Sequence, residues 1–181
     1  MQILQTAIPD VLIIEPRVLG DARGYFFESF NKRAFARATG LDLDFVQDNH
    51  SHSIKGVLRG LHYQIKRPQG KLMRVVRGSV FDVVVDVRRN SSTFGQWIGA
   101  ELSEDNRRQM WVPPGFAHGF LVTSDTADYL YKTTDYYAPE YECCIAWDDP
   151  TIGIHWPLDG APVLSAKDQR GKPLVLAEVY E

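Results

Sequence analysis

The sequence has 181 residues, enough for one domain with a large core that needs no metal or disulfide to hold it together. Its 20 basic and 23 acidic residues give a net charge of −3, which excludes a general electrostatic attraction to nucleic acid or to an anionic membrane. No stretch approaches the roughly 18 apolar residues that cross a bilayer, and the first ten residues lack the basic start of a secretory signal. The only two cysteines, Cys143 and Cys144, are adjacent and form no disulfide framework. We therefore expect residues 1–181 to be a single soluble domain of a reducing cytoplasm.

Helix signal is sparse along the chain. The best candidate is Lys32 to Thr39, with Asn31 as the N-cap and Gly40 as the C-terminal stop. Eight residues make only about two turns, so this helix is expected to decorate a fold built from other elements.

Strand signal dominates the middle of the sequence. From Val80 to Val87, Phe81 and the valines at the odd positions fall on one face, while Val80, Asp82, Val84 and Asp86 fall on the other. This period of two is typical of a strand. Further β-rich runs, separated by turn residues, are Leu72–Val76, Gln96–Leu102, Met110–Val112, Gly119–Val122 and Ala127–Thr133. Together they predict an all-β sandwich or barrel, with a tail from about Pro150 that wraps it in short helical pieces.

The histidines suggest where chemistry takes place. Three of the five lie between Asp48 and His62, a clustering that fits a metal site, an acid/base site or ordinary polar residues equally well. Two patterns favour function: a glycine six residues before His62, and Pro-Pro-Gly-Phe-Ala-His ending at His118. Together they resemble the two half-motifs of the cupin superfamily, which implies a double-stranded antiparallel jelly-roll barrel.

A metal-binding cupin carries His-x-His, then a glutamate, then a distant third histidine. In this sequence Gln64 stands where the second histidine would be, and no glutamate follows His62 before Glu101. His62 and His118 alone do not make a closed transition-metal site, which normally has three or four protein ligands. We therefore expect a barrel without a metal or other cofactor, whose histidines are free for acid/base work.

Four segments in order make the resemblance specific: Gly24–Glu28 (GYFFE), Gln47–Ser51 (QDNHS), Val57–Gln64 (VLRGLHYQ) and Pro113–Phe120 (PPGFAHGF). They resemble the signature of the dTDP-4-dehydrorhamnose 3,5-epimerase family, and the similarity extends to at least Asp168. The family implies a jelly roll with an N-terminal arm and a few short peripheral helices. It also implies cofactor-free inversion of the two carbons that flank the ketone of a dTDP-4-keto-6-deoxy sugar. A base on one face, an acid on the other and a partner for the enolate oxygen suffice for that chemistry.

The resemblance also assigns roles to individual residues. It implies that His62 is the base, that Asp168 orients it, and that Tyr131 is the acid. Lys71 is expected at the keto oxygen or a neighbouring hydroxyl. Without the family, Tyr131 would be an aromatic wall of the barrel, sharing a strand face with Tyr129.

The remaining implied residues bind the substrate. Arg23 and Arg59 fit the pyrophosphate, and Tyr137 matches the aromatic ring that stacks on thymine. On an extended strand Arg59 faces away from His62, unless Gly60 breaks the alternation. Further implied contacts are Phe26, Glu28, Gln47, Asn49, His118, Glu142 and Lys167. The arm that carries Arg23, Phe26 and Glu28 reaches a neighbouring subunit in the family, which implies a homodimer.

Three alternatives stay open at this point: a metal-dependent cupin, a non-catalytic sugar-binding cupin, and an epimerase that acts at one carbon or on another keto sugar. Gln64 and the missing glutamate weigh against the first, and the presence of both His62 and Tyr131 weighs against the second. We expect His50, His52 and His155 to be structural or surface residues, and the cysteines to be small strand residues.

Overall fold

The computed structural model describes residues 1–181, and strands dominate it. The strands are β1 (Gln2–Gln5), β2 (Leu12–Glu15), β3 (Leu19–Asp21), β4 (Gly24–Phe26), β5 (Gln47–Ile54), β6 (Leu58–Gln64), β7 (Lys71–Arg77), β8 (Ser79–Asp86), β9 (Trp97–Ser103), β10 (Gln109–Val112), β11 (Phe116–Val122), β12 (Thr126–Thr133) and β13 (Glu142–Cys144). The helices are α1 (Lys32–Thr39) and the 3₁₀ turns η1 (Pro139–Tyr141), η2 (Asp168–Arg170) and η3 (Leu174–Leu176). No helix has the length and hydropathy needed to cross a membrane.

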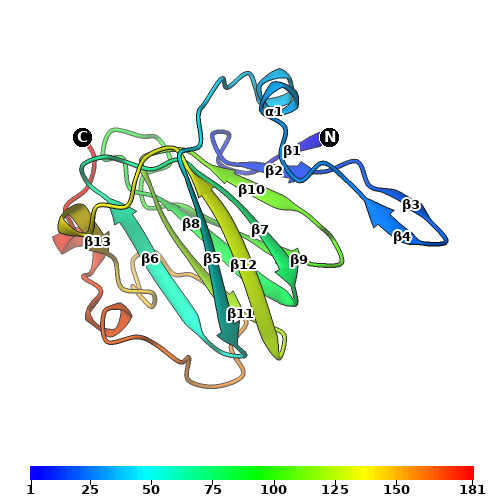
Figure 1. Ribbon diagram of the computed structural model, residues 1–181. Helices are drawn as coiled ribbons and strands as arrows, with labels where there is room; N and C mark the ends of the chain where they lie inside the picture. The colour runs from blue at the N-terminus through cyan, green and yellow to red at the C-terminus, as the bar shows by residue number, and fades with distance from the viewer.

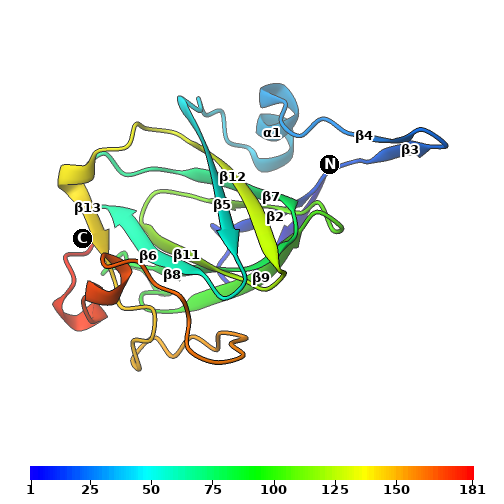
Figure 2. The same ribbon diagram turned by 60° about the horizontal axis from the view of Figure 1, so that its bottom comes forward.

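Two antiparallel sheets form the body of the molecule. One has six strands in the order β1-β2-β10-β7-β12-β5, and the other has five in the order β13-β6-β11-β8-β9. Figure 1 shows the strands and Figure 2 shows the two sheets as layers that lie one over the other. Non-consecutive neighbours, such as β10 beside β2 and β11 beside β6, make this a jelly roll. The predicted fold class is confirmed.

The alternation along β8 decides what lies between the sheets. Val80 and Val84 are fully buried in a cluster with Met73, Met110 and other side chains of the facing sheet. On the other face, Val83 and Val85 of β8 and Val87 just after it pack into a second cluster beneath the C-terminal tail. The two predicted faces of β8 are therefore both buried, because the barrel interior covers one and the tail covers the other.

The helix covers the outer face of the six-stranded sheet. Its bounds, Lys32–Thr39, match the prediction, and the Asn31 side chain accepts a hydrogen bond from the Ala34 amide at its N-terminus. Gly40 ends it with a φ of 78°, a left-handed conformation that glycine adopts without strain. Phe35 is the buried anchor and packs against Trp111 with ring centroids 5.7 Å apart.

An N-terminal arm projects from the body. Strands β3 and β4 pair only with each other, and Figure 1 shows the hairpin extending away from both sheets. Its one cation–π contact with the body is Arg107, whose guanidinium lies 4.3 Å from the centre of the Tyr25 ring. The predicted arm is therefore present, and most of its surface is free.

A bulge in β6 settles the orientation of Arg59. His118 of β11 pairs with His62, but Phe120 pairs with Arg59, so the register shifts between the two pairs. Gly60 lies in the bulge with a φ of 137°. The extra residue turns Arg59 and His62 to the same side, and both line one cavity. Gly60 thus breaks the alternation that would have separated them.

We predict that Gly60→Ala destabilises the protein, because a Cβ on Gly60 would lie 2.5 Å from the Cα of Gly119 on β11. The matched control is Gly160→Ala, since Gly160 has a similar φ of 131° with no atom within 4 Å of its Cβ position. Both variants place an alanine at a similar positive φ, so the difference between them reports mainly the clash. We expect Gly60→Ala to lose about 1–3 kcal/mol more in the free energy of unfolding than the control, measured by chemical denaturation. Equal losses would show that β6 and β11 do not approach this closely.

Candidate active site

A cavity of about 490 Å³ opens between the two sheets. Eleven of the fourteen site residues expected from the sequence line it: Gln47, Asn49, Arg59, His62, Lys71, His118, Tyr131, Tyr137, Glu142, Lys167 and Asp168. They come from β5, β6, β7, β11, β12, β13, the loop after β12 and the tail. The fold therefore gathers into one place side chains that are spread over more than a hundred residues of the sequence.

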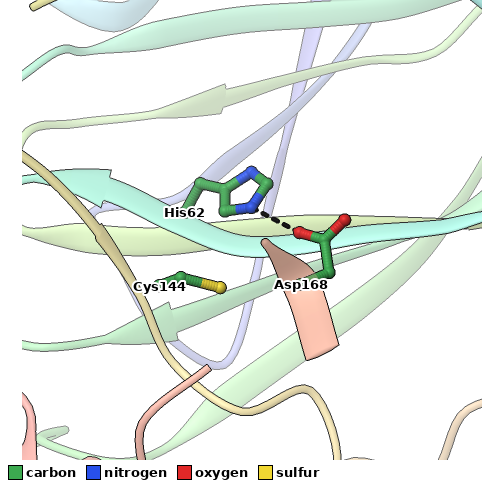
Figure 3. A group of neighbouring side chains, drawn as sticks. All are labelled: His62, Cys144 and Asp168. Atoms are coloured by element: carbon green, nitrogen blue, oxygen red, sulfur yellow. Dashed lines mark hydrogen bonds and ion pairs between the residues drawn. The ribbon is translucent and has the colours of Figure 1, made fainter. Parts of the chain in front are cut away.

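The shortest polar contact between candidate catalytic side chains joins His62 to Asp168. His62 Nε2 lies 2.6 Å from Asp168 Oδ1, and Figure 3 shows this bond with the other ring nitrogen turned away from the carboxylate. Burial would raise the pKa of Asp168, but the hydrogen bonds from His62 and Ser165 outweigh it and bring the pKa to about 2. An ionised carboxylate only accepts hydrogen bonds, so His62 Nε2 carries the proton. The lone pair of a neutral His62 is then on Nδ1.

Burial favours the basic form of His62. It lowers the pKa of the imidazole, although the Asp168 carboxylate opposes the shift. The ring is therefore predominantly neutral at neutral pH, the state that a general base needs. Because Asp168 is 3% exposed and comes from the C-terminal tail, only the folded chain supplies this partner.

Tyr131 reaches the cavity from the opposite sheet. It belongs to β12 of the six-stranded sheet, whereas His62 belongs to β6 of the five-stranded sheet. Burial raises the pKa of the Tyr131 phenol, so it keeps its proton at neutral pH and is available as a donor. A group bound between the sheets has the imidazole on one side and the phenol on the other.

Two cationic side chains, Lys71 and Arg59, also line the cavity. The Lys71 ammonium is 3.5 Å from the backbone carbonyl of His62, and burial lowers its pKa to about 8. Arg59 is exposed to the cavity and donates to the Ser53 hydroxyl through Nε and Nη2. Both are suited to contact anionic oxygens of a ligand.

A chain of hydrogen bonds crosses the mouth of the cavity. Gln47 Oε1 accepts from the Tyr137 amide at 3.0 Å, and the Tyr137 hydroxyl donates to Glu142 at 3.1 Å. Lys167 donates to the other oxygen of Glu142 at 2.8 Å. The Tyr137 ring is thereby held at the entrance with about half of its surface exposed, at 51%, a position suited to stacking on a planar group.

The other three expected site residues lie outside the cavity. Arg23 is 90% exposed and pairs with Asp21 on the arm, and Phe26 is 68% exposed. Glu28 accepts a hydrogen bond from Asn31 at the start of α1. Within one chain, the arm does not bring these residues to the cavity.

The side chains around His62, where a metal-binding cupin would hold its ion, are arranged for hydrogen bonding. His62, Asp168 and Cys144 have ligand atoms within 4.8 Å of one another (Figure 3). Two ligands of one transition-metal ion, each about 2.0–2.2 Å from it, lie roughly 3 Å or more apart, farther than the 2.6 Å between His62 and Asp168. Burial also raises the pKa of Cys144 to about 11, so its thiol is not the thiolate that a metal binds. These three residues do not fit a metal ion as they stand.

Gln64 has a structural role in place of metal ligation. Its side chain accepts from the Ala138 amide at 2.8 Å and donates to the carbonyl of Arg67 at 2.8 Å. It thus holds the loop that leads to Tyr137 against β6. The remaining histidines lie apart from the cavity: His50 and His52 are exposed and contact Asp128, and His155 lies against Trp97.

Among the residues that sequence reasoning missed, three hold predicted site residues in place. Ser165 donates to Asp168 at 2.6 Å, and the buried pair Asp82 and Tyr129 lies behind His118. The position of Asp82 among valines on a buried strand was the one available signal, because a carboxylate there requires hydrogen-bonding partners.

Comparison with known proteins identifies the family. The model of the family described as dTDP-4-dehydrorhamnose 3,5-epimerase matches residues 5–175. A protein of that name from Pseudomonas aeruginosa is 60% identical over 180 residues, covering 99% of both chains. The crystal structure of an epimerase from Legionella pneumophila in complex with dTDP-4-keto-L-rhamnose superposes with a TM-score of 0.96 at 51% identity, covering 99% of this chain and 98% of that one.

A relative with a narrower activity has the same fold. ChmJ, a 3′-monoepimerase from Streptomyces bikiniensis, was crystallised with dTDP-quinovose. It superposes with a TM-score of 0.90 at 35% identity, covering 97% of this chain and 88% of that one. The matched family model, the high identity over nearly the whole chain and the shared jelly roll agree, and the chain belongs to the dTDP-4-dehydrorhamnose 3,5-epimerase family.

Proposed function

We propose that this protein inverts C3 and C5 of dTDP-4-dehydro-6-deoxy-D-glucose and so forms dTDP-4-dehydro-L-rhamnose, a step of dTDP-L-rhamnose biosynthesis. The observation that carries this proposal is the placement of His62 and Tyr131 on opposing sheets of one cavity. Inversion requires that a proton leave one face of a carbon and that another arrive on the opposite face. A base and an acid on opposite walls meet that requirement.

The C4 ketone makes the reaction possible without a cofactor. His62 Nδ1 takes the proton from C3 or C5, and the electrons of the broken C–H bond move into the carbonyl to give an enolate. Asp168 stabilises the imidazolium that forms, and the Lys71 ammonium stabilises the enolate oxygen. The Tyr131 hydroxyl then gives its proton to the same carbon from the other face. Exchange with solvent returns His62 and Tyr131 to their starting states before the second carbon reacts.

The mouth of the cavity is suited to the nucleotide. Arg59 and Lys167 supply positive charge for the pyrophosphate, and Tyr137 offers a ring to the thymine base. The Gln47, Asn49 and Glu142 side chains provide the remaining polar contacts.

We propose further that the protein acts as a cytoplasmic homodimer in which each arm completes the site of its partner. The arm exposes Leu19, Tyr25 and Phe26, with 52%, 59% and 68% of their surfaces free, and a second copy would bury them. Arg23, Phe26 and Glu28 would then reach the partner's cavity. The two cysteines are unpaired, as a reducing compartment would keep them.

The second candidate is an epimerase that inverts C3 alone. The likeness to ChmJ favours it, because a 3′-monoepimerase has the same jelly roll. The relative of highest identity given above is named a 3,5-epimerase, so inversion at both carbons remains the better supported proposal.

Proton exchange in D₂O tests the reaction. We predict that the wild type, given the keto-sugar nucleotide, places deuterium at both C3 and C5 and inverts both centres, as followed by NMR. His62→Asn should slow exchange by about 10²–10⁴-fold because the base is gone. Tyr131→Phe should keep exchange but lose inversion, because the enolate can only be reprotonated from the original face or by water.

His50→Asn is the control for this experiment, since His50 lies on the outer side of β5 and should leave all rates unchanged. Exchange at C3 alone would select the single-carbon enzyme. An absence of exchange in the wild type would overturn the proposed function.

The pH dependence tests the role of Lys71. Burial lowers its pKa to about 8, and only the ammonium form stabilises an enolate, so kcat/KM should fall by about tenfold per pH unit above pH 8. On the acid side, kcat/KM should begin to fall at a pH below the usual pKa of histidine, because burial lowers the pKa of His62. Lys71→Arg should remove the alkaline fall, since a guanidinium stays charged. An unchanged alkaline limb in that variant would show that another group titrates there.

Subunit mixing tests the arm exchange. We predict that His62→Asn and Arg23→Ala are each nearly inactive alone, and that unfolding and refolding them as an equal mixture restores about a quarter of the wild-type activity. Half of the dimers would then be mixed, and each mixed dimer would hold one site with both native residues. Two copies of one variant, refolded together, are the control. No recovery in the mixture would mean that Arg23 serves its own chain.

A further inference from the structure

A second histidine–carboxylate pair lies beside the first. His118 of β11 is the cross-strand partner of His62 of β6, and its Nε2 lies 3.0 Å from Oδ1 of Asp82. Asp82 is fully buried on β8, in the barrel interior. Both neighbouring imidazoles therefore have Nε2 bound to a buried carboxylate.

Tyr129 completes the second pair. Its hydroxyl donates to Oδ2 of Asp82 and lies 3.1 Å from His118 Nε2. Burial raises the pKa of the Tyr129 phenol well above its usual value, so the phenol keeps its single proton. The ring is fixed by stacking on Phe120, with centroids 4.4 Å apart and an angle of 16° between the planes.

These contacts determine which nitrogen of His118 carries the proton. The Tyr129 proton goes to one oxygen of Asp82, so the other oxygen is free to accept from His118. A carboxylate has no proton to give, and Nε2 must therefore be the donor of that bond. Neutral His118 is then the Nε2–H tautomer, with its lone pair on Nδ1.

His118 Nδ1 opens into the cavity. No protein group hydrogen-bonds to Nδ1. The only fully buried polar side-chain atom without a hydrogen-bond partner is Arg107 Nε, so the unpartnered His118 Nδ1 must be accessible to solvent. His118 lines the cavity and keeps 10% of its side chain exposed. Nδ1 is thus an unoccupied acceptor on the cavity wall, next to His62.

A hydrogen-bond acceptor at this position distinguishes a sugar hydroxyl from keto and phosphate oxygens. Lys71, Arg59 and Lys167 only donate hydrogen bonds and suit the keto and phosphate oxygens of a nucleotide sugar. A sugar hydroxyl, in contrast, also has a proton to donate and needs an acceptor. In this cavity Asp168 is already occupied by His62 and Ser165, and Glu142 by Lys167 and Tyr137.

We propose that Asp82 and Tyr129 are positioning residues that hold His118 as the Nε2–H tautomer, so that Nδ1 accepts a hydrogen bond from a hydroxyl of the hexose. This inference rests on the proposed function, because it takes the ligand to be a nucleotide sugar. The contact exists in the ground state and in the transition state alike, so it serves substrate binding and orientation.

Asp82→Asn tests the proposal, because it keeps the shape of the side chain but exchanges an acceptor for a donor. The amide oxygen of the variant still accepts from Tyr129, and its NH₂ then donates to His118 Nε2, which forces the proton onto Nδ1. We expect long-range ¹H–¹⁵N NMR to show Nε2–H in the wild type and Nδ1–H in the variant. The His118 signal is assigned by its loss in His118→Gln.

Kinetics on the same samples give the second readout. A donor that faces a hydroxyl proton should raise KM for the keto sugar by roughly tenfold or more, with kcat within about threefold. The affinity for dTDP, which lacks the sugar, should stay unchanged. A merely structural defect would instead lower the fraction of active protein and leave KM in place.

Asp128→Asn is the matched control. Asp128 lies on β12, and its Oδ1 is 3.0 Å from His50 Nε2, the same contact on the outer face of the sheet. This variant should change neither KM nor the His118 signal. If Asp82→Asn does not fold, Tyr129→Phe replaces it; that variant keeps the ring stacking and should raise KM about 3- to 10-fold through a loosened Asp82.

Three results would overturn the proposal: Nδ1–H in the wild type, a changed tautomer without a change in KM, or an unchanged KM in Tyr129→Phe. Failure of the proposed function is distinguishable from these. A wild type that does not convert the keto sugar would refute the function, while the NMR measurement would still decide the tautomer of His118 on its own.

Discussion

The hydrogen bond between His62 and Asp168 joins parts of the chain that are 106 residues apart, and the chemistry of the site depends on it. Asp168 belongs to the tail, and Ser165 and the Gly60 amide also donate to its carboxylate. The tail stays in place because Ile152, Leu174 and Val179 are buried against the outer face of the five-stranded sheet. The basicity of His62 therefore depends on apolar packing on the side of the sheet that faces away from the cavity.

The interior of the barrel combines an apolar core, which stabilises the fold, with a polar cavity that can bind a ligand. Within the barrel, residues such as Met73, Val84 and Met110 form an apolar core. The polar cavity adjoins this core, and the stacked pair of Phe120 and Tyr129 belongs to the core yet also lines the cavity. Because side chains alternate along β12, Tyr129 and Tyr131 share its inner face: the first is fixed in the core and the second is free to act on a ligand.

Local charge in the cavity differs from that of the whole molecule. The chain as a whole is slightly acidic, with a net charge of −3, and so has no general attraction to an anion. The cavity nevertheless concentrates Arg59, Lys71 and Lys167, a distribution suited to a substrate that carries a pyrophosphate. Burial lowers the pKa of Lys71 to about 8, so the ammonium is costly to hold and gains most from a neighbouring negative oxygen.

Local signals in the sequence determined the helix, the main strands and the motifs of the site. Asn31 and Gly40 bounded the helix, the alternation from Val80 to Val87 predicted a strand with two faces, and the motifs around His62 and His118 indicated the barrel and its missing metal ligands. These signals are local, since caps, periods and motif spacings act over a few residues. Strand β5 was not predicted, because its inner face is polar: Gln47, Asn49 and Ser51 line the cavity, Ser53 accepts from Arg59, and the strand has no hydrophobic period.

Tertiary structure decided what depends on distant partners. The bulge at Gly60 turned Arg59 toward His62, and the approach of Gly119 from another strand made glycine necessary there. Asp168 meets His62 only because the tail folds over β6, and the link from Tyr129 through Asp82 to His118 spans three strands of two sheets. A sequence pattern predicts which face of its own strand each residue lies on. Hydrogen bonds between side chains that are far apart in sequence exist only after both sheets have packed, so the state of each catalytic group is a property of the folded barrel.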